Sequence, residues 1–569
     1  MKGKQLTAPK KRADSLIELL ELQSIKYGHS PVYSLLGRGS LGELCVSNAL
    51  SFSELEKQAK GLAAHLQSCQ GQGSVVLLCF PFGLEFTIAF WGCIMAGVVP
   101  IPLSRPKGND WRPILEIAFF TQANTLLTHS CLRATACDIV SLGSPLQIVE
   151  LDKLKGDFSR WKRPKLQRDD LAFVQFTSGS TSSPKGVSVS HANILANLES
   201  IEHAFSCSDR DITVSWLPFY HDMGLVGHIM QPVYSGMHNY FLAPMLFMSR
   251  PSLWLQAVSQ YGATISGAPN FAYDLCNQKV EEAQLRDLDF SRWRIAYCGS
   301  EPIAEVVATA FSHKLKPRGF LAEAFTPCYG LAESTLFVCS HSGLKSAHNK
   351  DKSDRYVCLG KPRFGELKIV RDQDLRECEE GEVGEIWLRS QSVVKTYYKD
   401  PERTRAVLRA HKGEGGIYLR TGDLGFLLEN ELYVVGRIKN LIKRRGKSFH
   451  CEDVERSLSA YLKEFPISRC VLLDTEYPSG LIVLVLESKG RLKNGACYDY
   501  EHTKFRTHVL REFGLLIDRI VEVRRGTLPL TTSGKIKRHE CIEIVKGLLT
   551  NKEGKHGKGN PKHRYSAST

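Results

Sequence analysis

The sequence of 569 residues lacks the paired cysteines of a zinc ribbon or a redox centre. It contains 17 cysteines, but no C-x-x-C spacing occurs, and the two closest are Cys131 and Cys137. An odd number of scattered cysteines in a long chain indicates free thiols in a reducing compartment. We therefore expect a cytoplasmic protein without a disulfide framework.

A secretory leader and a membrane span are also missing. Two glutamates interrupt the first apolar stretch, Ser15–Ile25, so no signal peptide is expected. Phe86–Leu103 has 18 residues and no charge, which approaches the length of a membrane span. Two prolines break its end, however, and the strand-like run Val75–Phe80 precedes it. We predict a strand, a buried helix and a short strand at Val98–Pro102, and no transmembrane segment.

The body of the chain has only a small net charge, although the formal net charge of the whole sequence is +14. The first 13 residues carry five basic residues and no acid, and residues 551–569 carry five basic residues and one acid. A nucleic-acid-binding protein usually has a basic face built into its fold, so no nucleic-acid partner is expected. We predict basic tails at 1–13 and 549–569, the second one disordered for want of an apolar period. An acidic protein partner or an anionic substrate suits this charge better.

A single hydrophobic core usually supports a chain of at most about 250–300 residues, and this chain is longer. Apolar runs of strand length alternate with helical periods, which predicts α/β layers with a mostly parallel sheet. From Arg355 the pattern changes to short strands between turn residues, which predicts a small β unit at about 355–436. Arg437–Lys447 carries six basic residues, and an α+β pattern follows it. We therefore predict a large domain over 14–436 and a small one over 437–548.

The strongest local signal is a segment rich in hydroxyls and glycine between two strand-like runs. Phe176–Gly186 reads FTSGSTSSPKG. Its backbone N–H groups and hydroxyls can surround one anion, Gly179 allows the backbone to approach closely, and Lys185 adds a positive charge. It is not a Walker loop, since Pro184 stands where that loop needs glycine. A serine-rich linker is the alternative, but such linkers rarely lie directly between two strands. The predicted phosphate site consists of Thr177, Ser178, Gly179, Ser180, Thr181 and Lys185.

Four further polar clusters lie in apolar surroundings, and each by itself has an ordinary explanation. A core histidine, an acid in the first turn of a helix, a turn cap and a surface lysine would account for them one at a time. The clusters are Trp216–Gly224 with His221 and Asp222, Tyr329–Thr335 with Glu333, Tyr418–Leu424 with Asp423, and Leu528–Arg538 with Lys535.

Together, in this order and spacing, the five motifs resemble the adenylate-forming superfamily of acyl-CoA synthetases, luciferases and peptide-synthetase adenylation domains. The resemblance covers about residues 50–545. In detail the chain looks most like the fatty acyl-AMP ligases. Amino-acid-activating domains usually carry an aspartate where this chain has Gly267–Tyr273, and none precedes Tyr273 here. The segments that carry the finer resemblance are Tyr220–Leu225, Gly267–Tyr273, Tyr329–Leu336 and Val357–Gly360.

The resemblance implies a fold and a motion. We expect an α/β protein whose large N-terminal domain holds two parallel-type sheets and a small β-barrel-like unit, followed by a mobile α+β domain. Lys439 falls at the superfamily's hinge position. Rotation there would exchange Lys535 and the Arg437–Lys447 loop at the active site. In fatty acyl-AMP ligases an insertion limits the use of coenzyme A, and it could sit here at His341–Arg355 or Arg363–Glu380.

The resemblance also implies a reaction with ATP and Mg²⁺. A fatty carboxylate attacks the α-phosphorus and pyrophosphate leaves, so catalysis depends on neutralising and positioning anions. By this resemblance, Thr177–Thr181 and Lys185 would bind the β- and γ-phosphates, and Glu333 with Thr181 would bind Mg²⁺. The adenine would contact Ser300, Glu301, Pro302, Tyr329 and Gly330, and the ribose would contact Asp423 and Arg437. Lys535 and His221 would contact the carboxylate and the α-phosphate, and the acyl slot would be lined by Trp216, Met223, Ala268 and Phe271.

Several functions remain open at this point. The leading hypothesis passes the acyl group to the phosphopantetheine of an acyl carrier protein, whose usual acidity suits a basic enzyme. A long- or medium-chain acyl-CoA synthetase differs only in the acceptor, and a stand-alone amino- or aryl-acid adenylation domain comes third. A binding protein without activity would be expected to lack Lys535, Glu333 or Asp423, and all three are present.

Overall fold

The computed structural model describes most of the chain. The described residues are 13–40, 42–106, 110–133, 146–177, 185–348, 355–410, 416–444, 447–462, 465, 467–475, 480–488, 496–530, 536–553 and 567–568. No helix among them is both long and apolar enough to cross a membrane.

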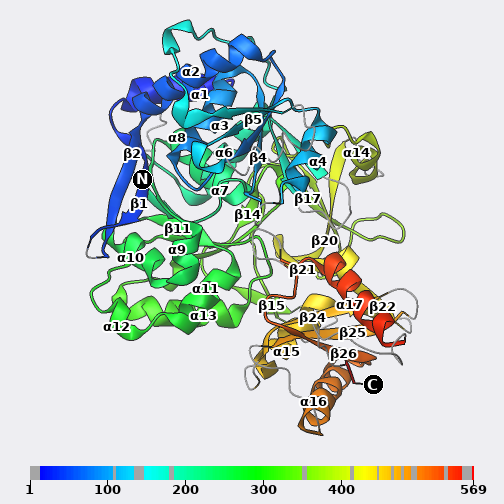
Figure 1. Cartoon of the computed structure of the whole chain (residues 1–569). Coiled ribbons are helices and arrows are strands. Elements are labelled where there is room, and N and C mark those ends of the chain that lie inside the picture. The colour runs from blue at the N-terminus through cyan, green and yellow to red at the C-terminus, as the bar shows by residue number, and fades with distance from the viewer. Residues whose placement is uncertain are drawn as a thin grey trace, which may run out of the picture.

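An eight-stranded sheet forms the centre of the N-terminal part, in the order β14-β13-β12-β11-β9-β10-β1-β2 (Figure 1). Its six inner strands are parallel, and the antiparallel strands β14 and β2 close the two edges. Because the inner strands run in one direction, the segments that follow them emerge on one side of the sheet. The strands are β1 (Pro31–Arg38), β2 (Leu44–Ser51), β9 (Ile212–Ser215), β10 (His238–Leu242), β11 (Ile265–Ala268), β12 (Ile295–Cys298), β13 (Phe325–Gly330) and β14 (Phe337–Ser340).

A second, four-stranded sheet is wholly parallel and has the order β4-β3-β5-β6. Along the chain between β3 and β4, α3 (Leu84–Ala96) is buried along nearly its whole length, which explains why this stretch carries so little charge. The other elements here are α2 (Phe52–Cys69), β3 (Val75–Cys79), β4 (Val99–Leu103), α4 (Arg112–Thr121), β5 (Thr125–Thr128), β6 (Gln147–Glu150), and the antiparallel pair β7 (Leu171–Thr177) and β8 (Lys185–Ser190).

Helices cover both faces of the large sheet. One core packs α1, α2, α3 and α6 together, and a second, rich in aromatic residues, joins α10, α11 and α13 to the sheet. The helices are α1 (Leu16–Tyr27), α6 (His191–Phe205), α7 (Asp222–Gly224), the π-helical turn Leu225–Met230, α8 (Gln231–Ser235), α9 (Pro244–Ser249), α10 (Ser252–Gln260), α11 (Asn270–Lys279), α12 (Glu282–Leu285) and α13 (Glu305–Leu315).

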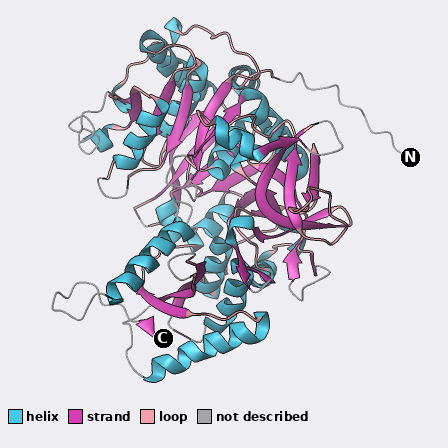
Figure 2. Ribbon diagram, turned by 90° about the vertical axis from the view of Figure 1, so that its right-hand side faces the viewer, coloured by secondary structure: helices cyan, strands magenta, loops and turns pink. Residues whose placement is uncertain are grey.

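A curved antiparallel sheet forms the β unit, with the order β17-β18-β20-β19 and β21 paired to β20 (Figure 2). The first stretch considered for an insertion contains β15, which pairs with β16. The second contains β17, and a turn after it brings Glu377 back to bridge Val370. The elements are β15 (Ser346–His348), β16 (Arg355–Val357), β17 (Glu366–Val370), β18 (Gly384–Arg389), α14 (Pro401–Val407), β19 (Leu408–Ala410), β20 (Ile417–Leu428) and β21 (Glu431–Arg437).

The C-terminal part is a smaller α+β unit that lies beside the β unit (Figure 1). Its sheet has the order β24-β25-β26-β27 and carries one apolar cluster on each face, packed by α15 and α16 on one side and α17 on the other. The last helix runs to Glu553 and so extends into the tail predicted to begin at residue 549. The elements are β22 (Leu441–Arg444), β23 (Lys447–His450), α15 (Cys451–Leu462), β24 (Ile467–Asp474), β25 (Ile482–Ser488), α16 (Ala496–Phe513), β26 (Arg519–Arg524), α17 (Arg538–Glu553) and β27 (Ala567–Ser568).

Candidate active site

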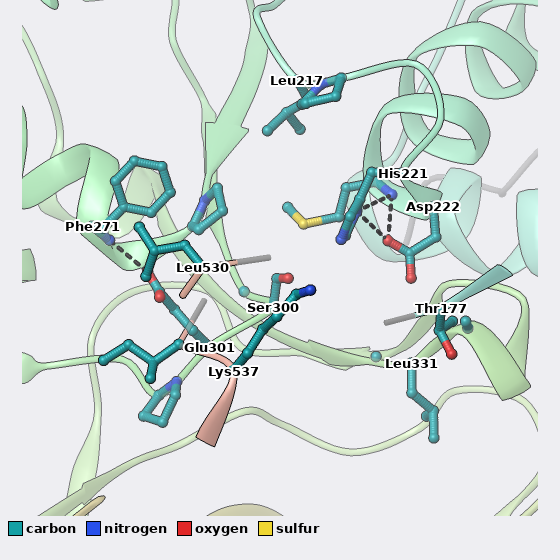
Figure 3. Close-up of a pocket in the computed structure, with 18 of the residues that line it drawn as sticks. Thr177, Leu217, His221, Asp222, Phe271, Ser300, Glu301, Leu331, Leu530 and Lys537 are labelled. Atoms are coloured by element: carbon teal, nitrogen blue, oxygen red, sulfur yellow. Dashed lines mark hydrogen bonds and ion pairs between the residues drawn. The ribbon is translucent and has the colours of Figure 1, made fainter. Parts of the chain in front are cut away.

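A cavity of about 2920 Å³ opens where the parallel strands of the eight-stranded sheet end. The residues that directly follow β9, β11, β12 and β13 line it, as expected for a ligand site at the carboxyl edge of a parallel sheet. The β unit and the C-terminal part form its other walls. Figure 3 shows its interior, with Phe271 on one side, His221, Asp222 and Thr177 on the other, and Ser300, Glu301 and Lys537 between them.

Tyr329, Asp423 and Arg437 form a polar group on the cavity wall, in which Tyr329 and Asp423 are buried and Arg437 is half exposed. The Tyr329 hydroxyl donates to Asp423 Oδ2 at 2.8 Å, and Arg437 Nε lies 2.8 Å from Asp423 Oδ1. The pairing of β20 with β21 sets Asp423 directly opposite Arg437. Burial, followed by the Asp423 charge, raises the pKa of Tyr329 well above its usual value, and the Asp423 charge raises the pKa of Arg437. Each carboxylate oxygen keeps a second lone pair for a ligand hydroxyl.

Glu333 and Lys185 meet on another wall, although 148 residues separate them. The Lys185 ammonium contacts Glu333 Oε1, and the Tyr397 hydroxyl donates to the same oxygen at 2.9 Å. Burial opposes the ionisation of Glu333, but the Lys185 charge and the hydrogen bonds from Lys185 and Tyr397 together outweigh it, and the pKa of Glu333 lies below its usual value. Glu333 lies on a single 3₁₀ turn, Ala332–Ser334, rather than at the start of a longer helix.

Sequence reasoning missed Tyr397, which belongs to none of the five motifs. Its position depends on the loop after β18, where the Tyr398 N–H donates to Gly186 O at 2.8 Å and Tyr397 bridges Val187. The Lys185 ammonium also lies 5.0 Å from the centre of the Tyr397 ring. A tyrosine pair beside a turn has no distinctive spacing, so no sequence signal would have identified this contact.

His221 and Asp222 face the cavity from the start of α7 (Figure 3). His221 Nδ1 lies 2.5 Å from Asp222 Oδ1, and the Met223 N–H donates to that same oxygen at 2.7 Å. The carboxylate therefore fixes the orientation of the imidazole ring. About a quarter of the His221 side chain is exposed, 24%, so a ligand can reach it.

Three of the four residues predicted for the acyl slot line the cavity, namely Trp216, Met223 and Phe271. The Trp216 ring stacks on Phe247 with centroids 3.9 Å apart, which fixes its plane. Ala268 is fully buried in the sheet and is not among the lining residues. The apolar wall has further members that sequence reasoning did not select: Leu217, Pro244, Met245, Met248 and Leu275.

Ser300, Glu301 and Pro302 follow β12 and line the cavity, as do Tyr329 and Gly330 on β13. Ser300 adopts a positive φ of 73°, so the chain turns sharply at the strand end. The Glu301 carboxylate accepts a hydrogen bond from the Phe271 N–H at 2.6 Å. It thus links the segment predicted for adenine to the segment predicted for the acyl chain.

Five predicted residues, Ser178, Gly179, Ser180, Thr181 and Lys535, lie outside the described residues. The residues on either side of these two segments are described, and they line the same cavity. Thr177 pairs with Lys185 across β7 and β8, and both line the cavity. Leu530 bridges Ile536, and the two residues line the cavity together with Lys537.

Lys439, the predicted hinge residue, lies in the 3₁₀ turn Ile438–Asn440 between β21 and β22. It also lines the cavity. Burial, then the charges of Arg437 and Lys185, lower the pKa of Lys439. These clustered cations favour an anionic ligand.

Comparison with known proteins identifies the family. The profile described as AMP-binding enzyme matches residues 42–398, well over half of the chain. The chain belongs to the AMP-binding enzyme family. The resemblance to the fatty acyl-AMP ligases and the predicted fold class are both confirmed.

The similarity of this AMP-binding enzyme to known proteins extends over nearly its whole length. It is 33% identical to the medium-chain-fatty-acid–[acyl-carrier-protein] ligase JamA of Moorena producens, over 94% of this chain and 96% of the relative. It is 29% identical to the long-chain-fatty-acid–AMP ligase FadD23 of Mycobacterium tuberculosis, over 88% and 91%. The structure of a fatty acyl-adenylate ligase from L. pneumophila, in complex with acyl adenylate and pyrophosphate, is 33% identical and matches with a TM-score of 0.71, over 95% and 98%.

Proposed function

We propose that this AMP-binding enzyme activates a fatty acid with ATP. A carboxylate oxygen of the acid forms a bond to the α-phosphorus, the bond from that phosphorus to the oxygen bridging to the β-phosphorus breaks, and pyrophosphate leaves. The phosphopantetheine thiol of an acidic acyl carrier protein then attacks the acyl carbonyl, and AMP leaves. Relatives named as fatty-acid–carrier-protein and fatty-acid–AMP ligases support this assignment.

The observation that carries the proposal is the joint position of two charge pairs on one cavity. Asp423 with Arg437 offers an acceptor for ribose hydroxyls beside a cation, and Lys185 with Glu333 offers a site for phosphates. An apolar wall around Phe271 completes the cavity. A nucleotide joined to an aliphatic chain matches these three regions in polarity.

The resemblance supplies the roles of the individual residues in this proposal. Thr177–Thr181 with Lys185 would hold the β- and γ-phosphates, Lys535 would bridge the carboxylate and the α-phosphate, and His221 would contact both. Adenine would lie between Ser300–Pro302 and Tyr329–Gly330. The acyl chain would lie along Trp216, Met223 and Phe271.

Mg²⁺ suits the donors at this site, because a buried carboxylate and nearby hydroxyls are hard oxygen ligands. Glu333 and Thr181 would hold the ion together with the nucleotide phosphates, and the ion would neutralise phosphate charge. Without a nucleotide, the Lys185 ammonium balances the charge of Glu333.

The test is mass spectrometry of a reaction with ATP, Mg²⁺ and a mixture of medium- and long-chain fatty acids. Parallel reactions contain coenzyme A or a carrier protein loaded with phosphopantetheine. The expected result is an acyl-adenylate that the carrier protein consumes and coenzyme A does not. Conversion to acyl-CoA would assign the synthetase reaction instead, and formation of adenylate only from aryl or amino acids would contradict a fatty-acid substrate.

A variant pair links the result to the cavity. Asp423→Asn removes the charge that faces the predicted ribose site, and hydrogen bonds to a charged group contribute about 1.5–3 kcal/mol, or roughly 10- to 100-fold in affinity. Asp374→Asn changes an exposed carboxylate of the same β unit and serves as the control. Equal ATP dependence in the two variants would contradict the assigned ribose site.

A further inference from the structure

A compact cluster of His341, Cys358 and Glu431 lies outside the nucleotide cavity. Among the described residues it is the group of histidine, cysteine and acidic side chains that is close enough to hold a metal ion, with all three ligand atoms within 4.8 Å of one another. None of the three lines the cavity described above. His341 follows β14, Cys358 follows β16, and Glu431 begins β21, so the cluster joins the edge of the large sheet to the β unit.

The hydrogen bonds of His341 orient it as a ligand. Nδ1 lies 3.0 Å from the carbonyl oxygen of Gly343, which can only accept, so Nδ1 carries the proton in the neutral ring. The lone pair of Nε2 then faces Glu431 Oε1 at 3.6 Å, too far for a direct hydrogen bond. A ring whose other N–H donates to a backbone carbonyl is the usual arrangement of a metal-binding histidine. A cation between these two acceptors would satisfy both.

Glu431 is held from its other side. Lys345 Nζ lies 2.7 Å from Oε2, and a second carboxylate, that of Glu429, lies 3.0 Å from the same ammonium. Lys345 thereby fixes the plane of the Glu431 carboxylate and leaves Oε1 directed at His341. Groups that hydrogen-bond to a ligating carboxylate in this way orient it for a metal ion.

Cys358 supplies a buried sulfur. Its side chain is fully buried, and the Gly360 N–H donates to Sγ at 3.4 Å. Cys358 forms a β-bridge with Tyr433, so the two side chains are cross-strand neighbours. The buried Tyr433 hydroxyl lies beside the Cys358 thiol.

We propose that His341, Cys358 and Glu431 bind one Zn²⁺ ion. Nitrogen, thiolate and carboxylate together suit this borderline-soft dication, and their two negative charges match it. The His341 and Glu431 side chains are 23% and 21% exposed, so water can take the fourth position. The ion would connect β14, β16 and β21 next to Val357 and Leu359, which line the nucleotide cavity. Its role would be structural.

The test uses the full chain, stripped with a chelator and titrated with Co²⁺ as a spectroscopic substitute for Zn²⁺. We expect one Co²⁺ per chain, a thiolate-to-cobalt charge-transfer band, and displacement of the Co²⁺ by one equivalent of Zn²⁺. Cys358→Ser should lose the band. Cys378→Ser, which changes another free cysteine of the β unit outside the cluster, should keep it. Lys345→Met should weaken Zn²⁺ binding roughly 10- to 100-fold by removing an outer contact.

Two further measurements keep the proposal falsifiable if Cys358→Ser does not fold. His341→Gln retains the thiol and should keep a weakened charge-transfer band. In the unaltered chain, Zn²⁺ should raise the melting temperature, and an excess of chelator should lower it. Absence of a stoichiometric Co²⁺ site, persistence of the band in a folded Cys358→Ser chain, or a melting temperature independent of Zn²⁺ would overturn the proposal.

Discussion

The Glu301 carboxylate accepts a hydrogen bond from the Phe271 N–H at 2.6 Å, and this contact joins two adjacent strand ends. Phe271 lies in the first turn of α11, so the negative charge also complements the N-terminal end of the helix. A segment predicted to contact adenine thereby positions a segment predicted to contact the acyl chain. The two halves of the adenylate would be held by one connected group of residues.

Removal of this link should affect both stability and acyl binding. Glu301→Ala leaves the Phe271 N–H without its acceptor, and we expect a loss of about 1–3 kcal/mol in the free energy of unfolding. Glu301→Gln keeps an oxygen acceptor and should lose less. Urea unfolding and the KM for the fatty acid measure the two effects. Equal behaviour of the alanine and glutamine variants would contradict the role of this hydrogen bond.

Lys185→Met should change how stability depends on pH. In the unaltered chain Glu333 has a lowered pKa, so its ionised form stabilises the fold above its unfolded pKa of about 4.3. This contribution disappears as the pH falls through the lower folded pKa. Without Lys185, burial raises the pKa of Glu333, and the variant should lose about 3 kcal/mol at pH 7.

The same variant should recover part of this loss as the pH falls from 7 towards 5, because Glu333 then takes up a proton in the folded state. Urea unfolding at several pH values measures it. Lys395→Met, which breaks an exposed ion pair with Asp169, is the control and should change stability by under about 0.5 kcal/mol at every pH. Parallel pH profiles for the two variants would contradict the Lys185–Glu333 pairing.

Tyr397→Phe tests a residue found only in the structure. It removes the hydrogen bond to Glu333 without changing the ring that Lys185 approaches, and should reduce the free energy of unfolding by about 1 kcal/mol. Tyr398→Phe alters the neighbouring tyrosine, whose ring packs near Phe120, and is the matched control. We expect the Mg²⁺ concentration needed for half-maximal adenylate formation to change in the first variant alone. An equal response from both would argue against a role for Tyr397 at Glu333.

Met223→Trp should shift the preferred chain length towards shorter acids, because the larger side chain fills part of the apolar wall. Each methylene excluded from an apolar site loses roughly 0.8 kcal/mol, about fourfold in kcat/KM. A series of fatty acids of increasing length measures the shift. Leu321→Trp, at an exposed position outside the cavity, is the control and should leave the profile unchanged. If Met223→Trp also keeps the chain-length preference of the unaltered enzyme, the acyl chain does not lie against Met223.

Lys439→Pro tests the predicted hinge. Lys439 lies in the 3₁₀ turn Ile438–Asn440, and the φ angle typical of a 3₁₀ turn is close to the one that proline imposes, so the observed arrangement should persist. A rotation that changes the φ angle of residue 439 should be blocked. We expect adenylate formation to continue while transfer to the carrier protein slows, as measured in separate half-reactions. Lys439→Ala removes the charge alone, and equal transfer rates in the two variants would exclude this hinge.

The sequence was enough to predict which segments carry polar and charged groups for the site, but not which residues from distant segments contact them. The predicted phosphate site around Lys185 and the turn at Asp423 are each contiguous in the sequence. The alternation of strands and helices predicted the α/β fold class. The contacts between these segments depend on packing. Ala268 illustrates the limit, since its segment reaches the cavity but its own side chain is buried in the aromatic-rich core.

The sequence by itself determined the chemical groups and the family, because each motif lies within about a dozen consecutive residues and needs no tertiary information. Only the tertiary structure decided the partners. Tyr329 meets Asp423 across 94 residues, and Lys185 meets Glu333 across 148. The cluster of His341, Cys358 and Glu431 arises from strand pairing between two sheets. Such contacts depend on how the sheets pack together, and spacing along the chain does not encode that packing.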